Sequence, residues 1–233
     1  MKHVSCIVII AALMLLPGCA ELLAELEQLD TIASSSPSDG LREALRVGTD
    51  RAVGSVGRLD GYLGNPDIKI PVPEKLQKVE KALRLLGADQ IVDEFSISMN
   101  RAAEAAAPVA KQVFLDAVRR MTFEDAMTIL RGNSHEATDY FRGTAGAELE
   151  RLFRPIVDDK LESVGATRSF NNLMRKVDDV PLLNRPVFDL NAYVTDEALD
   201  GLFLMLAREE QRIRNDPVAR TTELLRKWFG RQG

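Results

Sequence analysis

The residues best suited to acid–base chemistry lie near the middle of the chain, where Asp139 follows His135 by four residues. On a helix this spacing places a carboxylate one turn from an imidazole, an arrangement in which an acid can orient a general base. Tyr140 and Arg142 stand close by. No nucleophile motif accompanies them, and a lone histidine also serves as a capping or surface residue. The sequence therefore assigns no catalytic residue here.

A second group of carboxylates follows later, where Asp200 stands beside Gly201 in an otherwise apolar segment, with Glu209 and Glu210 further on. Asp200 is the carboxylate that we expect to be buried. A buried carboxylate pair could act as an acid/base couple, as in glycoside hydrolases, and a larger acidic cluster could hold Ca²⁺. No EF-hand spacing is present, so a structural ion pair competes with both. The partners that this interpretation offers to Asp200 are Arg101, Arg142 and Arg214.

The third polar group comprises Asn100, Arg101 and Glu104, in a segment otherwise rich in alanine. These residues lie off the apolar face of their predicted helix, and Glu104 points almost directly away from it. One interpretation is a solvated outer face. The other is a helix covered on both sides, because small residues surround the charges; buried charges would then need partners, and Arg101 would form a structural ion pair.

The first eighteen residues are typical of a bacterial leader. Lys2 precedes an apolar run over residues 4–16, which is shorter than the roughly 20 residues that span a bilayer. The run ends in Leu16-Pro17-Gly18-Cys19, which resembles the lipobox of bacterial lipoproteins. The resemblance implies cleavage before Cys19 and acylation of its sulfur, with two or more chains such as palmitate for stable anchoring. An ordinary secretory leader with a bystander cysteine is the alternative.

Removal of this leader leaves His135 as the single histidine and no free thiol, because Cys19 is acylated. Disulfides, thiolate chemistry and zinc sites built from Cys and His are thereby excluded. The net charge of −5 becomes −6 when Lys2 is lost, without a basic block that could follow phosphates, so we expect no nucleic acid partner. No phosphate loop, G-x-S-x-G or H-E-x-x-H motif is present, and we predict no cofactor and no metal.

Hydrophobic spacing predicts an all-α protein with a single multi-helix domain and long, kinked central helices. The segments are a leader (1–18), a lipid-anchored tether (19–38), the helical domain (39–230) and a tail (231–233). The clearest pattern is a coiled-coil-like seam through Pro108, where we expect a kink without reversal of direction. Its members are Val92, Phe95, Met99, Ala102, Ala106, Val109 and Val113.

Capping residues predict where the other helices begin. Thr122, with Asp125 three residues on, predicts a capping box. Ser134 is expected to cap a helix that ends at Arg142, and Thr195 a helix over residues 196–214. Pro155 is expected to interrupt the stripe that runs through Leu149 and Val157. The helix after Thr195 has an apolar stripe, and Leu204 and Met205, which lie outside that stripe, make its middle apolar on all sides. We therefore expect this helix to be central.

Several short strings together resemble the uncharacterised secreted bacterial family catalogued as domain of unknown function 4197. The resemblance covers about residues 41–230 and carries no assigned activity, substrate or catalytic residue. The strings are Asn100-Arg101-Ala102-Ala103-Glu104, Met121-Thr122-Phe123-Glu124-Asp125-Ala126, Ala137-Thr138-Asp139-Tyr140-Phe141-Arg142, Tyr193-Val194-Thr195 with Leu199-Asp200-Gly201-Leu202-Phe203, and Ile213-Arg214-Asn215-Asp216-Pro217.

The sequence thus favours a non-catalytic module that binds an envelope protein or a small ligand in a groove between helices. Its lipid anchor would hold it in the cell envelope, at the periplasmic face of the outer membrane, because Ala20 rather than Asp follows Cys19. The alternative is a carboxylate-based hydrolase that uses an Asp/Glu pair. The candidate functional or buried polar residues are Asn100, Arg101, Glu104, Asp139, Arg142, Asp200, Glu210 and Arg214.

Overall fold

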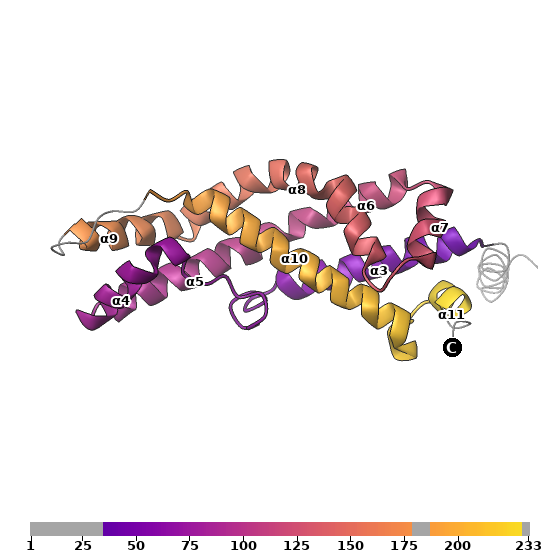
Figure 1. Ribbon diagram of the computed structural model, residues 1–233, viewed down its shortest axis with the longest axis horizontal. Coiled ribbons are helices and arrows are strands. Elements are labelled where there is room, and N and C mark those ends of the chain that lie inside the picture. Colours follow the sequence, from indigo (N-terminus) through magenta and orange to yellow (C-terminus); the bar gives the residue numbers. More distant parts are fainter. Residues whose placement is uncertain (1–34, 179–186, 230–233) are drawn as a thin grey trace, which may run out of the picture.

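The computed structural model describes residues 35–178 and 187–229, and throughout these ranges every regular element is a helix, which confirms the all-α prediction. The helix labels are those of Figure 1. The α-helices are α3 (Pro37–Val56), α4 (Gln77–Leu85), α5 (Asp89–Ala106), α6 (Ala110–Arg120), α7 (Phe123–Arg131), α8 (Glu136–Ser163), α9 (Ala166–Asp178), α10 (Leu190–Asn215) and α11 (Glu223–Phe229). Short 3₁₀ turns cover Glu74–Leu76, Ala107–Val109 and Pro217–Ala219.

The helices form an elongated bundle in which α10 is central, as its apolar stripe predicts (Figure 1). Helix α10 packs against α8, α3, α5 and α11. The start of α3 lies at one end of the bundle together with α7 and α11, whereas α4 and α9 lie at the other end. Most of the length of the molecule is therefore spanned by α8, α10 and the α5–α6 pair.

The predicted seam lies along α5 and α6, which continue in one direction through the 3₁₀ turn at Pro108. Proline at this position removes a backbone N–H and tightens the helix without reversing it. Phe95, Met99, Ala102 and Ala106 are fully buried. The prediction that the chain continues through Pro108 without reversal of direction is confirmed.

Helix α8 runs unbroken through Pro155, so the expected interruption and the expected helix end at Arg142 are both wrong. The proline lies on the exposed side of the helix, where solvent can bind the carbonyl that the proline leaves unpaired. Buried Leu149, Phe153 and Val157 on the opposite side hold the helix in place. Helix α8 ends where Gly165 takes a φ of 79°, a conformation that favours glycine.

Two predicted caps differ from the structure and one agrees. The Thr122 hydroxyl accepts a hydrogen bond from the Asp125 N–H, and the Asp125 carboxylate accepts one from the Thr122 N–H, so the capping box is confirmed. Thr195 lies buried inside α10, whose cap is instead Asp189. Helix α8 begins after His135 without a side-chain cap from its own chain neighbours, so Ser134 does not cap it.

The connection over residues 57–73 folds back against α5 and α10. Tyr62 is fully buried and donates a hydrogen bond from its hydroxyl to the Ala198 carbonyl at 2.6 Å. Gly201 makes this contact possible, because a Cβ atom there would lie 2.8 Å from Tyr62 Cε1 and 3.1 Å from Ile68 Cβ. The glycine next to Asp200 therefore has a packing role.

Candidate functional site

Asn100 is fully buried and supports the 57–73 connection. Its Oδ1 accepts a hydrogen bond from the Ile70 N–H at 2.8 Å, and its Nδ2 donates to the Ile70 and Ser96 carbonyls at 2.9 Å each. The carboxamide thereby satisfies backbone groups that the irregular segment cannot pair within itself. Asn100 is a structural residue, with no atom left for a ligand.

Glu104 and Arg101 also hold this connection. Although Glu104 points away from the seam, it is only 4% exposed, because the connection covers it. Its Oε1 accepts from the N–H groups of Tyr62 and Leu63, and its Oε2 accepts from Arg101 at 2.6 Å. Arg101 also pairs with Asp60 at 2.7 Å. Of the two interpretations, the helix covered on both sides is the correct one, and the ion pair is structural.

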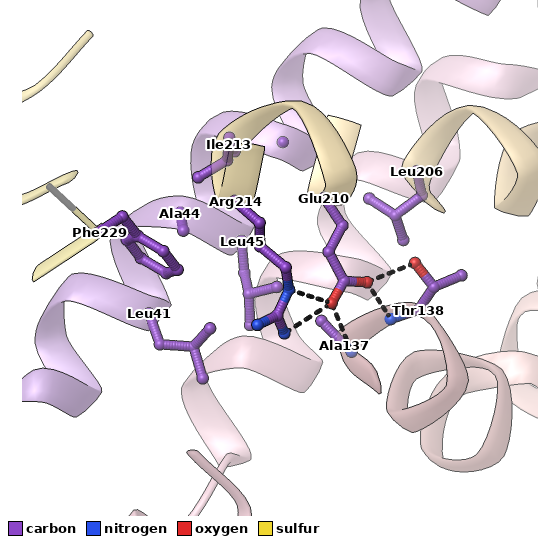
Figure 2. A pocket seen from close by; sticks show the side chains of 11 residues that line it. Leu41, Ala44, Leu45, Ala137, Thr138, Leu206, Glu210, Ile213, Arg214 and Phe229 are labelled. Atoms are coloured by element: carbon purple, nitrogen blue, oxygen red, sulfur yellow. Dashed lines mark hydrogen bonds and ion pairs between the residues drawn. The ribbon is translucent and has the colours of Figure 1, made fainter. Parts of the chain in front are cut away.

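Glu210 caps the start of α8 from a distant part of the chain (Figure 2). Its carboxylate accepts hydrogen bonds from the N–H groups of Ala137 and Thr138 at 3.0 Å each, and from the Thr138 hydroxyl at 2.9 Å. A negative charge at a helix N-terminus also suits the helix dipole. Arg214 pairs with Glu210 at 2.9 Å and donates to the Ile129 carbonyl at the end of α7. The pair joins α7, α8 and α10.

The cavity drawn in Figure 2 lies between this pair and α3. Its walls are mostly apolar, and its volume of about 20 Å³ is enough for one water molecule and too small for a ligand. The cavity therefore marks imperfect packing between α3, α8, α10 and α11. Its apolar walls include Leu41, Leu45, Leu206, Ile213 and Phe229.

A larger, open cleft of about 580 Å³ lies between the first turns of α8 and the middle of α10. It brings together four residues that the sequence indicated as candidates, namely His135, Asp139, Arg142 and Asp200. Its complete lining is Asn133, Ser134, His135, Thr138, Asp139, Arg142, Asp200, Phe203, Leu204 and Ala207. We call this region the α8–α10 cleft.

Arg142 and Asp200 form an ion pair at the rim of the α8–α10 cleft, with Nη1 and Oδ1 2.8 Å apart. The guanidinium also lies over the ring of Phe203, 4.4 Å from its centroid, as in a cation–π contact. The expectation that Asp200 is buried is wrong, since its side chain is 70% exposed. Gly201 faces the core, so the residue before it faces outward. The expected alternative, an ion pair with an arginine, is what the structure shows.

His135 and Asp139 both line the cleft, but the imidazole is oriented by another residue. The Gln211 amide nitrogen lies 2.9 Å from His135 Nε2, within hydrogen-bonding distance. Nδ1 is buried and has no hydrogen-bond partner in the described ranges. Asp139 is exposed, and among the described residues its carboxylate makes no hydrogen bond or ion pair. An acid–imidazole pair is therefore absent from this part of the structure, and Asp139 is free to meet a ligand.

The face of α10 next to the cleft is strongly acidic. Partial burial raises the pKa of Asp196, and the carboxylates of Glu150 and Asp200 raise it further. Partial burial also raises the pKa of Glu197, with added repulsion from Asp200 and Asp196. The carboxylates of Asp196, Glu197 and Asp200 therefore repel one another on this face of α10.

Sequence reasoning did not predict the apolar floor of the cleft or the partner of His135. Leu204 is 37% exposed on the outer face of α10, with Ala207 one turn further on. The signal was present, because Leu204 is an apolar residue beyond the stripe that the core requires. Nothing in the sequence connects His135 to Gln211, which is 76 residues away and meets it only through packing of α8 on α10.

Within residues 35–178 and 187–229, no group of three or more His, Cys, Asp or Glu side chains could hold a metal ion. In the same ranges, no helix has the length and apolar character needed to cross a membrane. The cleft is thus a mixed polar and apolar surface, with one imidazole, one paired guanidinium and one carboxylate without a partner.

The fold and the cleft define a helical bundle with an open groove between two long helices. The model of the protein family described as Protein of unknown function (DUF4197) matches residues 31–230, so the chain belongs to this family, as the short strings indicated. No curated protein and no solved structure matches the chain.

Proposed function

We propose that the protein is a lipid-anchored component of the bacterial cell envelope whose helical domain is a non-catalytic binding module. The α8–α10 cleft is its binding site, and the ligand is a small molecule or a segment of an envelope protein. Cys19 carries the lipid, and the domain stands at the periplasmic face of the outer membrane. Support for the anchor comes from the leader and from Leu16-Pro17-Gly18-Cys19.

The observation that carries the binding proposal is that most candidate polar residues are paired inside the fold, whereas Asp139 is not. Backbone N–H groups inside the fold donate hydrogen bonds to the side chains of Asn100, Glu104 and Glu210. Asp139, in contrast, reaches an open cleft with no partner among the described residues, next to exposed Leu204. Open clefts that combine an apolar floor with a few polar groups are typical of binding sites.

The hydrolase alternative gains no support from the geometry. An acid/base couple needs two carboxylates that are free to exchange protons with one substrate. Glu104 lies away from the α8–α10 cleft and is held by Arg101, and Asp200 is held by Arg142. Of the three carboxylates that this hypothesis names, Glu104, Asp139 and Asp200, only Asp139 has no partner among the described residues, and a single carboxylate does not make such a couple.

Native mass spectrometry tests the proposal. The chain with Cys19→Ala would be exported to the periplasm and purified without detergent. We expect a discrete added mass that Arg142→Ala reduces, because that variant removes both the ion pair with Asp200 and the contact with Phe203. The matched control is Arg154→Ala, which removes another exposed ion pair, between α8 and Asp189, outside the cleft. An added mass that Arg142→Ala leaves unchanged would place the ligand elsewhere.

The anchor has its own test. Intact mass measurement of the protein extracted from membranes should give a mature chain that begins at Cys19 and carries the mass of the acyl chains. Cys19→Ala should release the protein into the soluble periplasmic fraction. A membrane-extracted chain without added lipid mass would show that Cys19 is a bystander of an ordinary leader.

A further inference from the structure

Helix α4 combines exposed leucines and lysines on the same surface. Val79 and Leu83 are buried against the bundle, so Lys78, Lys81 and Leu85, which lie on the opposite side of the helix, face solvent. Leu85 is 88% exposed and Leu86 is 65% exposed. An exposed pair of large apolar residues at a helix end is unusual for a surface that meets only water.

The lysines around these leucines are not neutralised. Lys69, Lys75, Lys78 and Lys81 are exposed, and none of them forms an ion pair within the described ranges. Arg84, in contrast, is bound by Glu80, Asp89 and Asp93. The chain as a whole is acidic, with a net charge of −5, so this concentration of unpaired lysines is a local departure from the rest of the molecule.

A groove of about 640 Å³ runs beside the same helix and has two of these lysines in its walls. Its charged lining comprises Lys69, Lys81, Arg84, Glu80 and Asp93. Glu80 and Asp93 are paired with Arg84, so the two lysines are the charges of this lining that have no ion-pair partner among the described residues. The leucines project from the helical turn next to it, where Gly87 reverses the chain with a φ of 74°. We call the surface formed by Lys69, Lys75, Lys78, Lys81, Leu85 and Leu86 the α4 tip.

We propose that the α4 tip docks onto an anionic lipid surface. The lysines meet the headgroup phosphates, and Leu85 and Leu86 enter the boundary between headgroups and acyl chains, as the apolar residues of interfacial helices do. A protein partner fits this surface less well, since a standard interface covers about 800 Å² on each partner and α4 has nine residues. A membrane needs no matching shape.

The position of the α4 tip in the fold determines how the domain would be oriented on a membrane. Figure 1 shows α4 at the opposite end of the elongated bundle from the start of α3. A domain that is held at one end by its chain and touches a membrane with the other end lies lengthwise along that membrane. The lengthwise orientation rests on the proposed anchor, whereas the docking of the α4 tip depends neither on Cys19 nor on the α8–α10 cleft.

Vesicle sedimentation tests the proposal with the chain that carries Cys19→Ala. We expect binding to vesicles of phosphatidylethanolamine and phosphatidylglycerol, and little binding to phosphatidylcholine. Lys78→Gln combined with Lys81→Gln should weaken binding at least about tenfold, since each lysine near an anionic surface contributes about fivefold. Leu85→Ser combined with Leu86→Ser should abolish it. Each change is on the exposed surface, and equal thermal melting would show that the fold is kept.

Matched controls separate the α4 tip from general charge and apolarity. Arg131→Gln combined with Arg151→Gln removes two exposed positive charges elsewhere, and Leu59→Ser removes a leucine that is 73% exposed. Neither control should change vesicle binding. The proposal is overturned if the unmodified surface fails to bind anionic vesicles, or if the controls weaken binding as much as the α4 tip variants. Binding to a polyglutamate peptide without binding to vesicles would assign the surface to an acidic protein instead.

Discussion

The carboxamide of Asn100 pairs with both backbone polar groups of Ile70, 30 residues away in the chain, at 2.8 and 2.9 Å. This relationship shows how several polar residues of this chain are used: they complete the hydrogen bonds of backbone groups rather than face a ligand. Glu104 does the same for Tyr62 and Leu63, and Glu210 for the start of α8. Asp139, in the α8–α10 cleft, is not used in this way and makes no hydrogen bond or ion pair among the described residues.

Asn100→Ala should lower the free energy of unfolding by about 2 to 4 kcal/mol, because it leaves the buried N–H and C=O of Ile70 without partners. Urea unfolding followed by circular dichroism measures the change. Gln90→Ala, an exposed change on the same helix, is the control and should cost well under 1 kcal/mol. Equal effects of the two variants would contradict a structural role for Asn100.

Glu210→Gln should cost about 3 kcal/mol, since it removes the charge that caps α8 and leaves Arg214 without its ion-pair partner. The neighbouring Glu209→Gln is the matched comparison. Glu209 is also buried and pairs with Arg212 and, at 3.7 Å, with Arg51, but it accepts no hydrogen bond from a helix N-terminus. Its replacement should therefore cost less, about 1 to 2 kcal/mol. Thermal unfolding of the two variants side by side gives the difference, and the reverse order would refute the capping role.

Two glycine replacements should change stability in opposite directions. Gly201→Ala places a Cβ atom 2.8 Å from Tyr62 and should destabilise the protein by about 1 to 3 kcal/mol. Gly48→Ala, inside α3 beside the small cavity, places its Cβ atom 3.7 Å from Ile213, at ordinary contact distance. It should stabilise the protein by about 1 kcal/mol through helix propensity. Denaturant midpoints of both variants measure this, and a shift in the same direction would contradict the packing described.

The acidic face of α10 should make the stability of the folded protein depend on pH. The pKa values of Asp196 and Glu197 are raised in the folded protein. A raised carboxyl pKa gives stability that is present at low pH and is lost as the pH rises through the folded value. Asp196→Asn with Glu197→Gln should therefore raise the melting temperature at pH 7, and the gain should vanish below about pH 3, where carboxyl groups are protonated in both the folded and the unfolded chain. A gain that persists at low pH would show that repulsion is not the cause.

Local sequence patterns predicted helix starts and kinks where residues close together in the chain determine them. The capping box of Thr122 and Asp125 depends only on residues three apart, and the turn at Pro108 depends on the missing N–H of one residue. The start of α8 was missed because its cap is Glu210, 73 residues away from Ala137. Spacing along the chain cannot reveal a cap supplied by another helix.

The candidate site could be predicted only in part, because some of its contacts join segments that are distant in the chain. Asp139, Arg142 and Asp200 were recognised from residue type and surroundings, and the structure places all three around one cleft. The burial of Asp200 was mispredicted because the helix that contains it is apolar on most sides, while its exact orientation depends on Gly201 facing Tyr62. The contact of His135 with Gln211 required the packing of α8 against α10.

Site-specific photocrosslinking in intact cells tests the α8–α10 cleft most directly, because it captures a small ligand and a protein partner alike. A photoreactive amino acid would replace Leu204 inside the cleft, and in a parallel strain Leu59, which is exposed outside it. We predict a single adduct of discrete mass from position 204 that is absent from position 59 and is reduced by Arg142→Ala. No adduct at position 204, or the same adducts at both positions, would contradict binding in the cleft.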